Sequence, residues 1–94
     1  MKKAYLLVYS DTLGTRQEVK ACIDSIPEIV DWRFDLPQAF YLISEQTASN
    51  LSDLITQKMG KNGRFIIVEV ASNFSGWLPK AAWHLIQNKT RLIE

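Results

Sequence analysis

Few side chains of this chain are candidates for chemistry, and the first along the sequence is Asp11. It follows an apolar segment that ends at Tyr9, inside a polar stretch that runs to Gly14. A carboxylate just after a strand is exposed and held in place by the sheet, which makes Asp11 the candidate catalytic residue and the candidate metal ligand. The same stretch supplies no second carboxylate, and aspartate is also an ordinary turn residue. A purely structural role for Asp11 is therefore the favoured interpretation.

Cys22 and His84 are the only cysteine and the only histidine. Nucleophilic catalysis of the Cys-His or Ser-His-Asp kind needs the histidine beside the nucleophile. Cys22 falls at an apolar position of a predicted helix, which is typical of a small buried side chain. The chain has no G-x-S-x-G motif either. We do not expect a catalytic pair of Cys22 and His84.

Three basic residues, Lys58, Lys61 and Arg64, lie close together in the sequence. Such a cluster can bind phosphate groups, and with exposed aromatic side chains it could form a nucleic-acid footprint. The formal net charge of the chain is only +1, however, so its attraction for a polyanion is weak. Nucleic acid is a possible partner on these grounds, but not the favoured one.

Trp77 and Trp83 bracket Pro79 in the most distinctive stretch of the chain. Proline suits the first turn of a helix, so a helix is predicted to start here. Large aromatic side chains contribute much of the burial in a small core or in an interface. The two tryptophans either seal one end of the sheet or anchor a partner, and we assign both to a candidate interface.

The elements that must position these residues follow from capping, periodicity and proline. A strand is predicted over residues 4–9, and a helix starts at the capping box formed by Thr15 and Glu18 and stops before Pro27. Residues 29–34 alternate as an edge strand, with Val30, Trp32 and Phe34 on one side. The remaining predicted elements are a central strand at 39–43, a helix at 47–59 capped by Gly60, a strand at 64–70 and the helix that Pro79 starts.

The predicted order is β-α-β-β-α-β followed by one added helix at the C-terminal end. This order predicts an α+β, ferredoxin-like sandwich, in which two helices pack on one face of a four-stranded antiparallel sheet. A chain of 94 residues fits a single domain, here residues 1–94. Because the predicted strands are apolar on both faces, the face without helices would expose a large apolar patch, unless the added helix covers part of it. We therefore expect a homodimer, with Tyr5, Leu7 and Tyr9 at its interface.

Composition excludes several classes of protein. Hydrophobic residues make up 47% of the chain, which excludes a disordered protein, and a single cysteine excludes a disulfide framework. No apolar run approaches the ~20 residues that span a bilayer, and Met1 leads through two lysines into a strand-like segment without a cleavage site. We expect a cytoplasmic protein with no membrane partner and no bound cofactor.

The whole pattern resembles the small CRISPR-associated adaptation proteins and the related VapD-type ribonucleases, since an aspartate directly follows the first strand in Tyr9-Ser10-Asp11. In those families a dimer brings two such aspartates together around a metal ion. In this chain Ser10 separates the usual tyrosine-aspartate pair. Three stretches, 11–14, 39–44 and 76–80, are also similar to short bacterial proteins catalogued as SinR-like. The predicted strands argue against the helix-turn-helix repressor role which that label implies.

Three functions follow from these observations, and whether the chain is an enzyme stays open. The leading hypothesis is a non-enzymatic, dimeric interaction or regulatory module. The alternative, which the resemblance implies, is a nuclease dependent on Mg²⁺ or Mn²⁺, with Asp11 from each subunit binding the ion. The weakest is a nucleic-acid-binding module.

Overall fold

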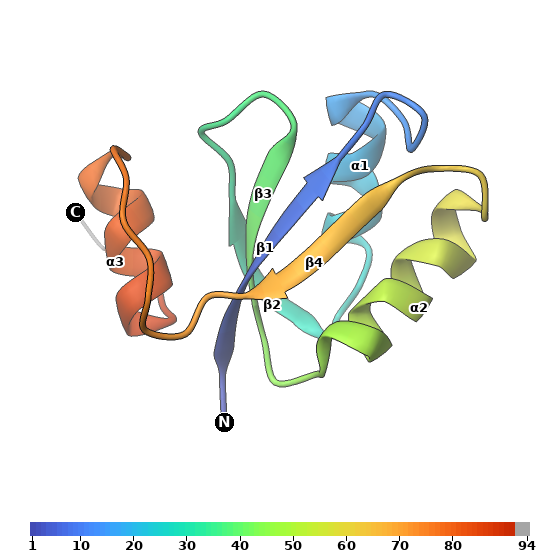
Figure 1. The fold of residues 1–94 in the computed structure, drawn as a ribbon. Coiled ribbons are helices and arrows are strands. Elements are labelled where there is room, and N and C mark those ends of the chain that lie inside the picture. The colour runs from blue at the N-terminus through green and yellow to red at the C-terminus, as the bar shows by residue number, and fades with distance from the viewer. Residues whose placement is uncertain (92–94) are drawn as a thin grey trace.

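Four strands and three helices make up the α+β fold of the computed structural model, which describes residues 1–91 (Figure 1). The elements are β1 (Lys3–Tyr9), α1 (Arg16–Asp24), β2 (Ile29–Arg33), β3 (Ala39–Ser44), α2 (Ala48–Met59), β4 (Phe65–Glu69) and α3 (Lys80–Asn88). The predicted order of elements is confirmed along the described chain, and the bounds lie close to those expected.

The strands form one antiparallel sheet in the order β2-β3-β1-β4. β3 and β1 lie in the centre, and all six residues of β3 are buried. β2 and β4 lie at the edges. The expectations of an edge strand at 29–34 and of a central strand at 39–43 are both confirmed. The apolar character of residues 39–43 on both faces has a direct cause, because both faces of β3 are covered.

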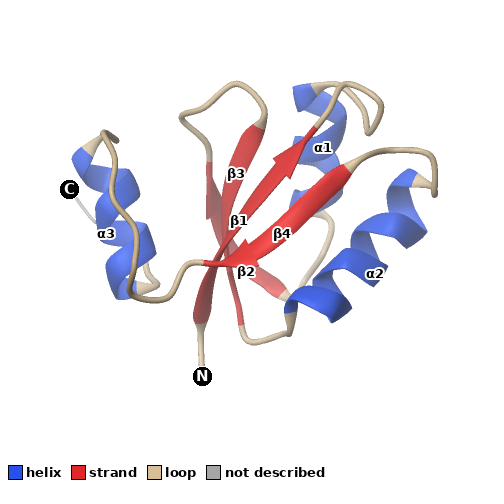
Figure 2. Ribbon diagram, viewed as in Figure 1, coloured by secondary structure: helices blue, strands red, loops and turns tan. Residues whose placement is uncertain are grey.

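One face of the sheet is covered by α1 and α2, as Figure 2 shows. Tyr5, Leu7 and Tyr9 of β1 point to this face and belong to its core, each of them at most 4% exposed. The expectation that these three residues form an interface is therefore corrected. Period-2 alternation correctly places them together on one face, but the sequence does not show which face the helices cover.

The opposite face is partly covered by α3, which makes the third layer of the fold (Figure 1). Ala82, Leu85 and Ile86 of α3 pack on Tyr41 and Ile43 of β3 and on neighbouring β1. The possibility that the added helix covers part of the open face is thus confirmed. Its cover stops short of β4, where apolar side chains remain exposed.

The ends of α1 and α2 are set by capping residues close to them in the sequence. Thr15 caps α1 with a complete capping box: its Oγ1 accepts from the Glu18 N–H at 3.2 Å, and the Glu18 carboxylate accepts from the Thr15 N–H at 2.8 Å. The same hydrogen bonds hold the pKa of Glu18 below its usual range. The Thr47 hydroxyl caps α2 by accepting from the Asn50 N–H at 3.1 Å, and Gly60 ends that helix at a φ of 90°.

A β-bulge changes the expected side-chain pattern of β2. The register against β3 shifts between Ile29 and Asp31. Ile29 is buried in the core under α1 and α2, whereas Val30 is 51% exposed. The prediction that Val30 lies on the same side as Trp32 and Phe34 is wrong for this reason. An extra residue in one strand breaks the strict alternation on which that prediction depends.

Candidate functional site

Asp11 lies in the loop between β1 and α1, and its side chain is exposed. The Gln38 side-chain amide, from the connection between β2 and β3, donates a hydrogen bond to the Asp11 carboxylate. The Gln38 main-chain carbonyl in turn accepts from the Tyr9 N–H at 3.1 Å. Asp11 is therefore held by a neighbouring loop that is itself fixed to the end of β1.

The rest of this loop is attached to the start of β4. The Ser10 N–H donates to the Arg64 carbonyl at 3.0 Å, and the Arg64 N–H donates to the Thr12 hydroxyl at 3.1 Å. The two backbones approach so closely that a methyl group on Gly63 would lie 2.5 Å from Leu13 Cα. Glycine at position 63 is required by this contact. The loop is thus a fixed structure rather than an open chain segment.

A divalent metal ion needs several oxygen ligands, of which Asp11 supplies one carboxylate. Within residues 1–91, no three side chains of histidine, cysteine, aspartate or glutamate come close enough to hold an ion together. One copy of the described chain thus contributes a single carboxylate ligand at this loop. A metal centre here requires further ligands from a second copy or from a substrate.

Cys22 and His84 lie on opposite sides of the sheet. Cys22 belongs to the core between α1, α2 and the sheet, whereas His84 belongs to α3 on the other face. Burial raises the pKa of the Cys22 thiol, and nearby Lys58 opposes that effect. The His84 ring nitrogen Nδ1 lies 3.3 Å from the Asn88 side-chain nitrogen, within its own helix. The structure does not bring the two residues together, as expected.

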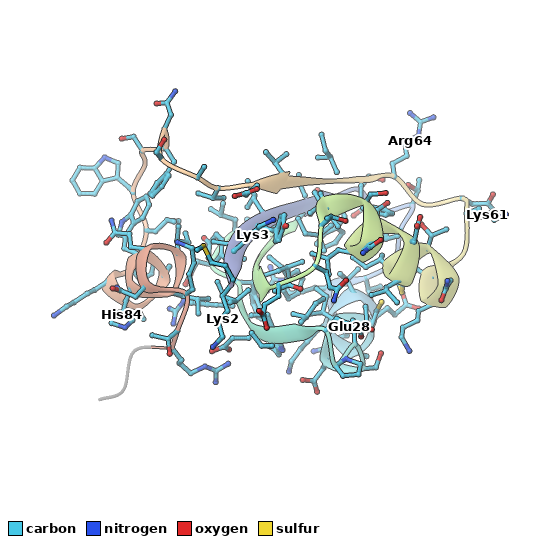
Figure 3. The ribbon with its side chains drawn as sticks, turned by 90° about the horizontal axis from the view of Figure 1, so that it is seen from below. Lys2, Lys3, Glu28, Lys61, Arg64 and His84 are labelled. Carbon is cyan, nitrogen blue, oxygen red and sulfur yellow. The ribbon has the colours of Figure 1, made fainter. Side chains whose placement is uncertain are left out.

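The basic residues after α2 are all exposed. Lys58 is near the end of α2, Lys61 is in the turn, and Arg64 directly precedes β4. Figure 3 shows Lys61 and Arg64 pointing outward at the end of the molecule far from His84. Arg64 lies beside the Asp11 loop, because its backbone is hydrogen-bonded to Ser10 and Thr12 of that loop.

The two tryptophans of the interface prediction have different environments. The Trp83 side chain is half-buried and stacks on Phe74, with the ring centroids 5.9 Å apart and the planes at 18°. Trp77 is 100% exposed. A fully exposed tryptophan is unusual, because the burial of its ring is strongly favourable.

A pocket of about 340 Å³ lies between α3, the 71–79 segment and the sheet. Its lining includes the following side chains from three parts of the fold: Leu6, Tyr41, Phe74, Trp77, Trp83 and Ile86. Apart from the Tyr41 and Ser75 hydroxyls and the indole N–H groups of the two tryptophans, the lining side chains are apolar. Sequence analysis identified the two tryptophans but missed Leu6 and Tyr41. Both lie in apolar strands, where the sequence pattern indicates core residues rather than a site. Only the packing of α3 against the sheet brings them close to the tryptophans.

An exposed apolar patch lies on the same face of the sheet, beyond the cover of α3. Its most exposed side chains are Val8 on β1 and Ile66 and Val68 on β4, which are 41%, 58% and 47% exposed. Val8 is paired with Ile66, and Leu6 with Val68, across neighbouring strands. These two pairs form one continuous surface, which we call the open patch (Leu6, Val8, Ile66 and Val68).

No protein-family model, curated protein or solved structure matches this chain. Among the described residues, no helix is both long enough and apolar enough to cross a membrane.

Proposed function

We propose that this chain is a small homodimeric interaction module with a ferredoxin-like fold, acting in the cytoplasm. The ferredoxin-like assignment is supported by the β-α-β-β-α-β order, by the antiparallel sheet order β2-β3-β1-β4, and by α1 and α2 on one face. The cytoplasmic location agrees with a single cysteine, Cys22, as a buried free thiol.

The observation that carries the dimer proposal is the open patch. Val8, Ile66 and Val68 are all about half exposed, and they adjoin one another across β1 and β4. Exposed apolar side chains are ordinary when scattered, but a continuous group on a sheet face marks an interaction surface. Trp77 adds a fully exposed ring on the side of the sheet that α3 occupies.

A second copy of the chain is the partner we propose for this surface. The open patch carries no charged side chain, so the same surface on another copy can pack against it without repulsion between like charges. Two-fold dimers use one self-complementary surface on both subunits, and they are the commonest closed assembly. Within a single chain, the apolar side chains of β4 are exposed to water. Pairing with a second copy would bury them.

Light scattering at micromolar protein concentration tests this proposal. We expect the mass of a dimer for the natural chain and of a monomer for Val68→Lys, because a lysine in the patch places two like charges at the two-fold interface. Val30→Lys is the matched control. It makes the same change at a valine that is also about half exposed, but on β2 at the other edge of the sheet. A monomer mass for the natural chain would reject the dimer.

The alternative function is a nuclease that uses Asp11 of both subunits to bind Mg²⁺ or Mn²⁺. It is supported by the exposed carboxylate of Asp11 in a loop fixed by hydrogen bonds on both sides. The backbone of Arg64 is hydrogen-bonded to that loop, and the Arg64 and Lys61 side chains point outward, where they could contact a phosphate backbone (Figure 3). Nucleic-acid binding without cleavage would use the same basic residues, and its affinity would fall with added salt.

A further inference from the structure

The pocket beside α3 has one feature that the interaction surface does not explain. Tyr41 is 3% exposed, and its hydroxyl is buried without any hydrogen-bond partner among residues 1–91. A buried hydroxyl that makes no hydrogen bond destabilises the fold, so such groups are rare unless they serve a purpose. Tyr41 is also one of the residues that line the pocket, a space large enough for a small molecule.

The surroundings of Tyr41 define the chemistry of that donor. Burial raises the pKa of Tyr41, and the nearby Asp35 carboxylate acts in the same direction, with Arg33 opposing. The phenol therefore stays protonated and can donate a hydrogen bond. Asp35 and Arg33 are already paired with each other at 2.9 and 3.0 Å. Neither of them is among the lining residues, so the pocket provides no charged group for an ionic ligand.

The rest of the lining selects a flat apolar ring. Phe74, Trp77 and Trp83 surround the space together with Tyr41, and aromatic rings favour stacked or edge-on contacts with one another. Two lining side chains at the rim are open to solvent: Trp77 is fully exposed and Leu36 is 43% exposed. The Tyr41 hydroxyl is shielded from solvent in this structure, so a ligand in the pocket reaches it only after a neighbouring lining side chain shifts.

We propose that this pocket binds a small, neutral aromatic molecule and that the Tyr41 hydroxyl donates a hydrogen bond to an acceptor atom on it. Binding would bury the apolar lining and satisfy the one buried hydroxyl that lacks a partner within the described chain. This inference does not depend on the dimer, because the pocket is formed by α3, the 71–79 segment and the sheet of one chain.

Two aromatic probes of the same shape test the proposal. Quinoline has a ring nitrogen that accepts a hydrogen bond, and the molecule is uncharged at neutral pH. Naphthalene has no hydrogen-bond acceptor. We would titrate each into the protein and follow the indole N–H signals of Trp77 and Trp83 by NMR. Trp32, which packs on the other side of the sheet, is the internal reference.

Both probes are expected to shift the signals of Trp77 and Trp83 but not that of Trp32. In Tyr41→Phe, the affinity for quinoline should fall about tenfold, as expected for the loss of one hydrogen bond, while that for naphthalene should not change. Tyr9→Phe is the matched control, because its hydroxyl lies on the other face and donates to the Pro37 carbonyl at 3.5 Å. It should leave both affinities unchanged.

Tyr41→Phe is also expected to fold at least as stably as the natural chain, since it removes only an unpaired hydroxyl. Three results would overturn the proposal: no shift with either probe, equal loss of both probes in Tyr41→Phe, or a less stable Tyr41→Phe protein without ligand. The last would show that the hydroxyl is already paired in the free protein. None of these results changes the mass measured by light scattering, so failure here is distinct from failure of the dimer.

Discussion

Thr15 illustrates how far a single residue can be understood from its neighbours in the sequence. Its hydroxyl accepts from the Glu18 N–H, which otherwise has no partner at the start of α1. We expect Thr15→Ala to lower the free energy of unfolding by about 0.5–2 kcal/mol. Thr15→Ser keeps the hydroxyl and should cost much less. Chemical denaturation of both variants measures this, and an unchanged midpoint for Thr15→Ala would contradict the role of the cap.

Glu18, on the other side of the capping box, predicts a pH dependence. Its folded-state pKa is lowered by hydrogen bonds from Thr15, so the ionised carboxylate stabilises the folded chain at neutral pH. That stabilisation is complete above the ordinary glutamate pKa and is lost as the pH falls through the lowered value. We expect the stability difference between the natural chain and Glu18→Gln to shrink on acidification. Denaturation curves between about pH 7 and pH 3 test this, and a constant difference would argue against it.

Asp11 is the residue at which the two main functional proposals differ. If two subunits bind one metal ion through Asp11, then Asp11→Asn abolishes cleavage of RNA or DNA that depends on Mg²⁺ or Mn²⁺. If Asp11 only accepts the hydrogen bond from Gln38, the same change alters stability slightly and nothing else. We expect the second outcome. Metal-dependent cleavage by the purified natural chain, lost in Asp11→Asn, would favour the nuclease.

The Asp11 loop and the turn before β4 approach each other closely, with Gly63 at the point of contact. A methyl group on Gly63 meets the backbone of Leu13, which cannot move aside as a flexible side chain can. We expect Gly63→Ala to destabilise the fold by about 1–3 kcal/mol. Gly76→Ala is the control, because nothing lies within 4 Å of the added methyl group there. Equal stability of the two variants in thermal denaturation would contradict this account.

The two outer layers of the molecule differ in the size of the core that joins them to the sheet. α1 and α2 share one large core with the sheet, whereas α3 packs through a smaller one and has no side-chain cap at Pro79. We therefore expect backbone amides of α3 to exchange with solvent faster than those of β1 and β3. Hydrogen exchange followed by NMR tests this, and protection of α3 equal to that of β1 would show a single cooperative unit.

Several features of the fold are determined by the local sequence. The capping box at Thr15, the stop before Pro27 and the cap at Gly60 were all predictable, because each depends on interactions between residues close in the chain. The central position of β3 was also predictable, since a strand that is apolar on both faces must be covered on both. Alternation likewise placed Tyr5, Leu7 and Tyr9 together on one face.

Only the tertiary structure decided which face the helices cover and where α3 packs. Alternation is symmetric with respect to the two faces of a sheet, so Tyr5 could not be assigned to the core or to an interface from the sequence. The pocket depends on the packing of α3 as well, because it joins Leu6 and Tyr41 to tryptophans more than thirty residues further along the chain. Contacts between residues so far apart leave no periodic signal in the sequence, and they form only when the layers pack together.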